Sequence, residues 1–229
     1  RDDVESRGLG DVYKRQFRQV ITDYYGEGSP AYNLLGTANT NWQDEILRTS
    51  VSSDYNLSVG GTYKILPYRI AVSYTNQNGI LKTSAMDRVT ASITLNPKFF
   101  DNTLSVTANV KGFYMHNRFA DEGAIGGAVS FDPSQSVRVD NLPIGNGYFT
   151  WLKPGTDEFI GIAPVNPVSL IDERSMKADV YRSVGNLQLD YVMPFLPALH
   201  ANLNLGYDVA KTTGRNFVNS NSVQSSLDK

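Results

Sequence analysis

Thr103-Leu104-Ser105-Val106-Thr107-Ala108-Asn109-Val110-Lys111 alternates polar and apolar residues over its whole length. Successive side chains of a β-strand point to opposite faces, so a strand with this sequence has one polar and one apolar face. Five further stretches show the same period of two, and they are residues 55–63, 68–75, 88–96, 186–191 and 199–208. The pattern predicts an all-β chain whose strands share one apolar and one polar face.

The connections between these stretches differ greatly in length. Short turns are expected at Lys64–Pro67, Pro97–Asn102 and Pro194–Pro197, because proline lacks the N–H that a central ladder position needs. The other connections are longer and include residues 119–178. Outer-membrane barrels have short turns at one end and long loops at the outer end. We therefore expect an antiparallel up-and-down transmembrane β-barrel segment, an incomplete barrel of about six strands, with a long extracellular loop.

Strand length and aromatic placement fit this interpretation. A strand of about ten residues rises about 3.3 Å per residue, and a tilt near 45° lets it cover an apolar band of roughly 25 Å. Tyrosines near strand ends suit the two membrane interfaces, although each is also an ordinary strand former. They are Tyr55, Tyr63, Tyr68, Tyr74, Tyr191 and Tyr207. The side chains predicted to face lipid are Ile70, Val72, Ile93, Leu95, Val106, Val110, Leu189 and Leu203.

The chain divides into five consecutive regions. Residues 1–16 are rich in charge of both signs and end in a stretch similar to translated adapter sequence, so we expect a non-native tail there, with a native disordered arm as the alternative. Residues 17–50 are predicted to be a loop with a short helix within Asn39–Arg48, capped by Thr40 or Asn41. The remaining regions are barrel strands in 51–118, the long extracellular loop in 119–178, and further strands with the start of the next loop in 179–229.

Composition excludes several kinds of function. The net charge of -2 and the isoelectric point near 5.7 leave no basic field for nucleic acid. The chain has no cysteine, which removes disulfides, thiolate metal sites and cysteine nucleophiles. No apolar run is long enough for a transmembrane helix, a requirement that barrel strands do not share. Because no signal peptide opens the chain, we expect an internal piece of a longer exported protein.

Residues capable of catalysis are few and scattered. His116 and His200 have no carboxylate partner at a suggestive spacing, so we expect both to be solvated side chains that face the lumen. Three acidic pairs in or beside the long loop are expected to be solvated charge, and they are Asp121-Glu122, Asp157-Glu158 and Asp172-Glu173. A β-rich hydrolase would need convergent carboxylates that the sequence does not display. We expect no enzyme, and no catalytic, cofactor-binding or metal site.

The long loop carries five aromatic residues that are candidates for contact with a substrate or a partner protein. A flat apolar ring beside polar groups suits both sugars and proteins, and packing within the loop is the alternative role. The candidates are Phe131, Tyr148, Phe149, Trp151 and Phe159. The small, apolar segment Gly123–Val129 is expected to form a short helix inside the loop.

Four further segments are distinctive in their composition and order. They are Thr40-Asn41-Trp42-Gln43-Asp44-Glu45-Ile46, Asn56-Leu57-Ser58-Val59-Gly60-Gly61, Tyr74-Thr75-Asn76-Gln77-Asn78-Gly79-Ile80-Leu81, and Gly123-Ala124-Ile125-Gly126-Gly127-Ala128 with Asp132-Pro133. In this order and approximate spacing they resemble the SusC/RagA family of TonB-dependent outer-membrane transporters of Bacteroidetes. The resemblance covers roughly residues 17–229.

The resemblance implies a large barrel in the outer membrane of a Gram-negative, Bacteroidetes-like cell, surrounded by outer-membrane lipid. It also implies an N-terminal plug in the lumen, a SusD-like lipoprotein over the outer mouth, and import of oligosaccharides or peptides powered by the TonB complex through the plug region. The plug, the TonB box and the C-terminal strand are expected to lie outside this chain, which is therefore not expected to transport alone. The alternative is a soluble all-β carbohydrate-binding or adhesin-like module whose apolar faces pack on one another.

Overall fold

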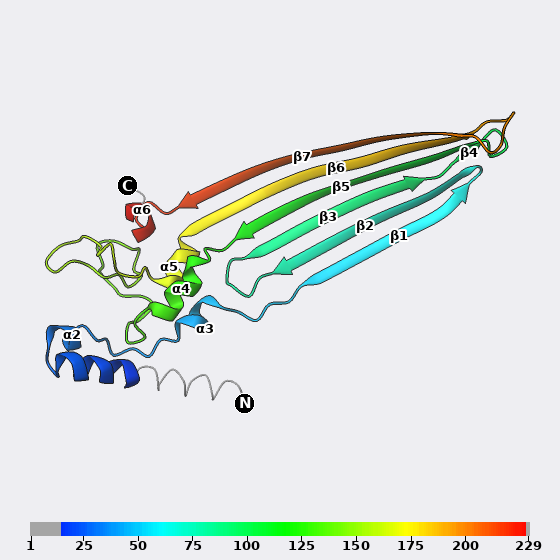
Figure 1. The fold of residues 1–229 in the computed structure, drawn as a ribbon. Coiled ribbons are helices and arrows are strands. Elements are labelled where there is room, and N and C mark those ends of the chain that lie inside the picture. Colours follow the sequence, from blue (N-terminus) through cyan, green and yellow to red (C-terminus); the bar gives the residue numbers. More distant parts are fainter. Residues whose placement is uncertain (1–14, 228–229) are drawn as a thin grey trace.

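One open antiparallel sheet dominates the computed structural model, which describes residues 15–227. The sheet has seven strands, and its long strands run in the order β1-β2-β3-β5-β6-β7 (Figure 1). The bounds are β1 Ser53–Tyr63, β2 Leu66–Asn78, β3 Ala85–Leu95, β4 Lys98–Phe99, β5 Leu104–Phe119, β6 Arg174–Val192 and β7 His200–Val218. Each long strand pairs with the next long strand along the chain, so the predicted up-and-down, incomplete barrel segment is confirmed.

Short and long connections lie at opposite ends of the sheet. The turns at residues 64–65, 96–103 and 193–199 share one end, where β4 also pairs with the start of β5 (Figure 1). The opposite end carries residues 79–84, the long segment 120–173 and the helices (Figure 1). The alternation expected from the sequence is therefore present, and it gives the molecule two different ends.

Two strands are longer than the sequence pattern predicts. β6 and β7 each contain 19 residues, because β6 begins at Arg174 and β7 continues to Val218. In these added parts the apolar face becomes polar, so the period of two disappears from the sequence. The backbone ladder does not depend on side-chain polarity and continues without a break.

Pro67 does not lie in a turn as expected. It is the second residue of β2, opposite Thr62 of β1. Its carbonyl oxygen accepts a hydrogen bond from the Asn96 amide, one residue beyond the end of β3. The N–H that proline lacks would point to that same side, so the missing hydrogen bond falls at the very end of the β2–β3 ladder and leaves its interior intact.

Short helices cover the end of the sheet that carries the long segment. They are the helical residues 15–25, α2 Pro30–Asn33, α3 Trp42–Ile46, α4 Gly123–Ser130, α5 Pro167–Asp172 and α6 Val223–Leu227. The Asn41 side chain caps α3 by accepting from the Gln43 amide, whereas Thr40 donates to the Gln135 carbonyl at 2.6 Å. The expected helices of α3 and α4 are confirmed, while the helix over 15–25 was not expected. The expected tail at residues 1–16 lies almost entirely outside the described residues.

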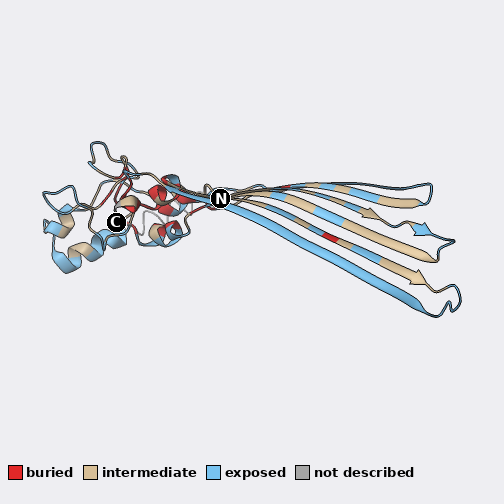
Figure 2. Ribbon diagram, turned by 90° about the horizontal axis from the view of Figure 1, so that it is seen from above, coloured by how far each residue is buried: buried red, intermediate tan, exposed pale blue. Residues whose placement is uncertain are grey.

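These helices and the long segment 120–173 together form what we call the cap, and the hydrophobic core that they enclose is the cap core. Buried residues gather there, whereas the sheet is almost entirely exposed or half-buried (Figure 2). The cap core consists of Trp42, Ile46, Leu81, Ala120, Ala124, Ala128, Phe131, Tyr148, Val168 and Ile171. The Trp42 indole packs edge-on against Phe131 at 4.6 Å between ring centroids and donates its N–H to the Asp132 carbonyl at 3.0 Å. Segments 90 residues apart in the chain are thereby joined.

The apolar face of the sheet is open. Of the residues predicted to face lipid, five expose between 38% and 50% of their surface, and these are Ile70, Val72, Ile93, Val110 and Leu203. Leu95, Val106 and Leu189 are half-buried. Within residues 15–227 no second sheet packs on this face, so the closed two-layer core required by the soluble alternative is not formed. Contact with lipid stays a prediction.

Tyrosines on this face lie at two levels along the strands. Near the cap, Tyr55 stacks on Tyr74 at 6.5 Å and Tyr114 meets Tyr181 at 4.7 Å, centroid to centroid. Near the short turns the face carries Tyr63, Tyr68 and Tyr191. Tyr207 is not at a strand end as expected, because β7 is longer than predicted. Instead its ring covers Gly185, where an added Cβ would come within 2.1 Å of the ring.

Among residues 15–227, no helix is both long enough and apolar enough to cross a membrane.

Glu173 links the cap to β6 and is buried, which corrects the expectation that it is solvated. One carboxylate oxygen accepts from the Asn146 amide, and the other has no hydrogen-bond partner among the described residues. Burial raises the pKa of the Glu173 carboxyl, although the Asn146 hydrogen bond and the charge of Arg138 act in the opposite direction. The folded cap therefore favours the protonated carboxyl.

Gly36→Ala is expected to weaken the docking of the N-terminal segment on the cap. An added Cβ would lie 2.1 Å from the Ser134 carbonyl oxygen, a backbone atom that cannot move away cheaply. Hydrogen exchange of residues 29–40 in the full-length protein should become faster. Gly161→Ala is the control, since nothing lies within 4 Å of its added Cβ. Equal exchange in both variants would contradict the contact.

Glu173→Gln is expected to reduce the pH dependence of cap stability. A folded-state pKa above the ordinary value of 4.5 stabilises the fold below that pH, and this contribution is lost as the pH rises through the folded pKa. The variant should therefore be more stable than the wild type near neutral pH, by hydrogen exchange of the cap across a pH series. Glu158→Gln is the control, because Lys153 lowers the pKa of the exposed Glu158. A pH profile unchanged by Glu173→Gln would exclude this role.

Candidate functional site

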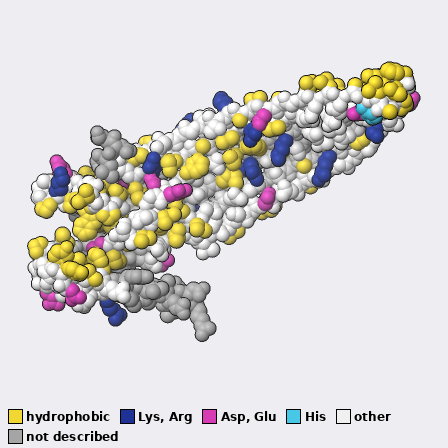
Figure 3. Space-filling view, viewed as in Figure 1, with side chains coloured by type: hydrophobic (Ala, Val, Ile, Leu, Met, Phe, Trp, Pro, Cys, Tyr) yellow, Lys and Arg dark blue, Asp and Glu magenta, His cyan; other side chains and the backbone are white. Residues whose placement is uncertain are grey.

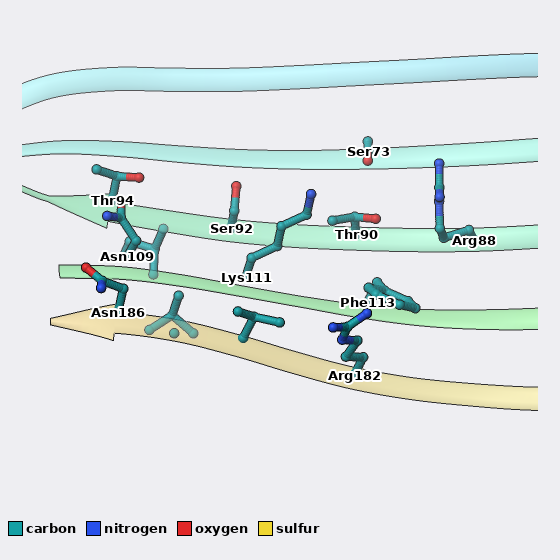
Figure 4. A pocket seen from close by; sticks show the side chains of 14 residues that line it. Ser73, Arg88, Thr90, Ser92, Thr94, Asn109, Lys111, Phe113, Arg182 and Asn186 are labelled. Carbon is teal, nitrogen blue, oxygen red and sulfur yellow. The ribbon is translucent and has the colours of Figure 1, made fainter. Parts of the chain in front are cut away.

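The polar face of the sheet carries the candidate functional surface. Strand parity places side chains there that alternate with the apolar ones, including Ser73 on β2, Thr90 on β3, Lys111 on β5 and Asn186 on β6. They surround a shallow groove of about 640 Å³ (Figure 4). The labelled side chains of Figure 4 come from four neighbouring strands, β2, β3, β5 and β6, so the groove depends on the order of the sheet.

Cations dominate the middle of this face. Arg88, Lys111 and Arg182 line the groove, and lysine and arginine side chains stand out along the middle of the sheet in the space-filling view (Figures 3 and 4). The Arg182 guanidinium is neutralised by Asp208, with Nε donating to the carboxylate at 2.8 Å. Arg88 and Lys111 form no ion pair with any described residue. The groove can therefore attract carboxylate, sulfate or phosphate groups.

Aromatic residues of the long segment lie in the cap rather than on the sheet. Phe131 and Tyr148 are buried in the cap core, whereas Phe149, Trp151 and Phe159 are half-buried. Phe149 contacts Phe131 at 6.1 Å and Trp151 at 4.9 Å, both edge to face. Packing within the loop thus accounts for Phe131 and Tyr148, the two buried rings. The other three rings keep some exposed surface, and a role of the five candidates in substrate or partner contact stays a prediction.

Tyr148 anchors a polar network beneath these rings. Its hydroxyl donates to Asp172 at 2.8 Å and accepts from Arg138 at 2.6 Å, while the same guanidinium lies 4.1 Å from the ring centroid. Burial, followed by the hydrogen bond to Asp172, raises the pKa of the Tyr148 phenol far above its ordinary range. The hydroxyl stays protonated at physiological pH and holds the loop in place.

Both histidines have carboxylate partners that sequence spacing did not reveal. His116 Nδ1 lies 2.7 Å from Asp179, and His200 Nδ1 lies 3.0 Å from Asp190. His116 also shares the apolar residues' face of β5, so the expectation of a solvated, lumen-facing His116 is wrong. Both pairs form between neighbouring strands, across the ladder. The spacing of the partners along the sequence therefore does not reveal them.

Asp157 and Glu158 are exposed, as expected for solvated charge, and Glu158 pairs with Lys153 at 2.7 Å. The other two acidic pairs contain residues with partners inside the protein. Asp121 forms an ion pair with Arg174 at 2.9 Å, and Asp172 accepts from Tyr148. These contacts hold the start and the end of the long segment to the cap, so structural roles explain them. Among residues 15–227 no group of three or more His, Cys, Asp or Glu side chains could hold a metal ion.

No protein-family model matches the chain. Its sequence is 38% identical to the TonB-dependent receptor SusC of Bacteroides thetaiotaomicron over 214 residues, which cover 89% of this chain and 21% of SusC. The chain thus spans about a fifth of the length of that curated relative.

Solved structures share the fold. The RagAB peptide importer in its closed-closed state matches with a TM-score of 0.61 at 16% identity, over 87% of this chain and 23% of that one. Its open-open state matches with a TM-score of 0.60 at 16% identity, over 86% and 22%. The sequence match and the open sheet of barrel-type strands lead to one conclusion: over most of its length this chain is similar to a segment of SusC/RagA-type TonB-dependent receptors.

Proposed function

We propose that the sheet is part of the barrel wall of a TonB-dependent importer in the outer membrane of a Gram-negative bacterium. Its apolar face meets lipid, its polar face lines the lumen, and the cap lies on the extracellular side. The assignment of the cap to the outside follows from the long segment at that end, because outer-membrane barrels carry their long loops outside.

The observation that carries this proposal is an apolar face without a cover. A soluble protein rarely exposes an apolar surface that spans a whole sheet, because burial of such surface drives folding in water. Lipid removes that cost. The outer edges of β1 and β7 are unpaired in the described sheet. Because backbone groups in lipid need hydrogen-bond partners, further barrel strands are expected to pair with both edges.

Partners and substrate follow from the relatives. RagAB is described as a peptide importer, and SusC as a TonB-dependent receptor. We infer that the full-length protein takes up oligosaccharides or peptides, with a SusD-like lipoprotein at the cap side and TonB on the periplasmic side. The cations of the groove would face the lumen, where carboxylate groups of a solute or of a plug are suitable partners.

Val110→Arg is expected to destabilise the full-length barrel by about 2–4 kcal/mol, the cost of a cation near the bilayer midplane. Val110 lies near the middle of the apolar run that extends from Leu104 to Tyr114 on β5. Val106→Arg, closer to the short-turn end, should cost less. Folding titrations into lipid bilayers measure both.

Asn109→Arg is the matched control, because Asn109 is adjacent in sequence and lines the groove on the polar face. It should change stability by well under the cost of Val110→Arg. Equal losses at residues 109 and 110, or none at 110, would contradict the assignment of the faces.

The function itself is tested with the tagged full-length protein in its native host. We expect the protein to lie in the outer membrane and to bind a lipoprotein. Cells should need it for growth on an oligosaccharide or peptide mixture, and this growth should also need active TonB. Uptake should stop when the proton-motive force is removed. Recovery of the full-length protein from the soluble fraction, or growth independent of TonB, would overturn the proposal.

A further inference from the structure

The register places three cations in a row across β5, β6 and β7, near the strand ends that adjoin the cap. Arg118 is the register partner of Lys177, which in turn is the register partner of Arg215. Adjacent strands are about 4.8 Å apart, so the backbone positions of this cation row span roughly 10 Å. Such a width is comparable to one lipid headgroup.

The cation row lies on the apolar face and not on the lumen face. Arg118 is separated from Val110 by an even number of residues on β5, and Arg215 is separated from Leu203 by an even number on β7. The register of these strands runs without a bulge between those residues, so parity is conserved. The cation row is thus distinct from the groove of Arg88 and Lys111.

No ion pair between described residues neutralises this row. Like charges directly opposite one another on a sheet are destabilising, yet Arg118, Lys177 and Arg215 form no ion pair with a described residue. Two carboxylates lie on this face, two residues from the row. Asp87 of β3 accepts from Tyr74 at 2.9 Å and from Asn76 at 2.7 Å, and Asp179 of β6 interacts electrostatically with Arg215. Asp179 Oδ1 already accepts from the Tyr114 hydroxyl at 2.8 Å and contacts His116 at 2.7 Å. The row therefore leaves an excess of positive charge.

Below the cation row the same strands become amphipathic and then apolar. Tyr114 and Tyr181 lie four residues away, about 13 Å along the strands, beside Lys211 of β7. Val110 and Leu205 follow on the apolar face. Tyrosines prefer the level where acyl chains meet headgroups, and long cationic side chains extend from there toward phosphates.

We propose that the cation row binds the phosphate groups of a phosphorylated glycolipid in the outer leaflet, whose acyl chains cover the apolar face below. Charge complementarity together with an apolar surface beneath it selects an anionic amphiphile. A soluble anion would make no use of the apolar residues. This inference rests on the proposed function, which places the cap end at the outer surface.

The test measures binding of fluorescent lipid A to the full-length protein in detergent, with dephosphorylated lipid A as the second probe. The triple variant Arg118→Ser, Lys177→Ser, Arg215→Ser should bind lipid A on the order of a hundredfold more weakly, at about fivefold per cation. Binding of the dephosphorylated probe should not change. Lys177→Ser alone should lose about fivefold, which keeps the test decisive if the triple variant does not fold.

A charge-matched control removes three cations from the polar face of the same sheet, as Arg69→Ser, Arg88→Ser, Lys111→Ser. It should bind lipid A like the wild type. Unchanged binding by the cation-row variants would overturn the inference, as would an equal loss in the control. Displacement of lipid A by inorganic phosphate at a similar affinity would also overturn it, because the ligand would then be a soluble anion.

Failure of this inference is distinguishable from failure of the proposed function. A protein that reaches the outer membrane and imports in a TonB-dependent manner, but binds lipid A equally with and without the cation row, contradicts the lipid site alone. A protein absent from the outer membrane contradicts the proposed function.

Discussion

An uninterrupted antiparallel register joins all six long strands, and every surface of functional interest depends on it. Within every paired stretch of these strands, each residue has a partner directly opposite on the neighbouring strand, without a bulge. Side chains therefore keep the same parity from β1 to β7, which separates apolar residues from the cationic groove. A slip of one residue would exchange the two faces.

The cap supplies the hydrophobic core that the sheet lacks. A sheet that is exposed on both faces supplies little core, and the buried apolar residues gather instead where Trp42 meets Phe131 (Figure 2). Two of the four segments that carry the family resemblance, around Trp42 and around Gly127, contribute residues to this core. Gly127 of α4 faces α5, since an added Cβ would be in van der Waals contact with the Pro167 Cβ at 3.4 Å. The cap thus fixes the segment before β1 to the long segment between β5 and β6.

Local patterning was sufficient to predict the strands, the two ends of the sheet and the helix at Trp42, because these features depend on neighbouring residues. It was insufficient where the environment changes along one strand. β6 extends to Arg174 and β7 to Val218, although their apolar faces become mostly polar beyond Tyr181 and Val209. Contacts between strands were equally hidden, as in the pair of His116 and Asp179. The burial of Glu173 also depends on distant residues, which no local pattern contains.

The most direct test of the account is the environment of each side chain along β5. The described chain has no cysteine, so single cysteines can be placed from residue 104 to 114 in the full-length protein and spin-labelled in lipid bilayers. Oxygen collides preferentially with labels in lipid, and water-soluble paramagnetic agents collide with labels in the lumen. The account predicts a period of two, with oxygen maxima at even residue numbers. Labels that are all accessible to water, or maxima at odd numbers, would contradict the assignment of this sheet to a barrel wall.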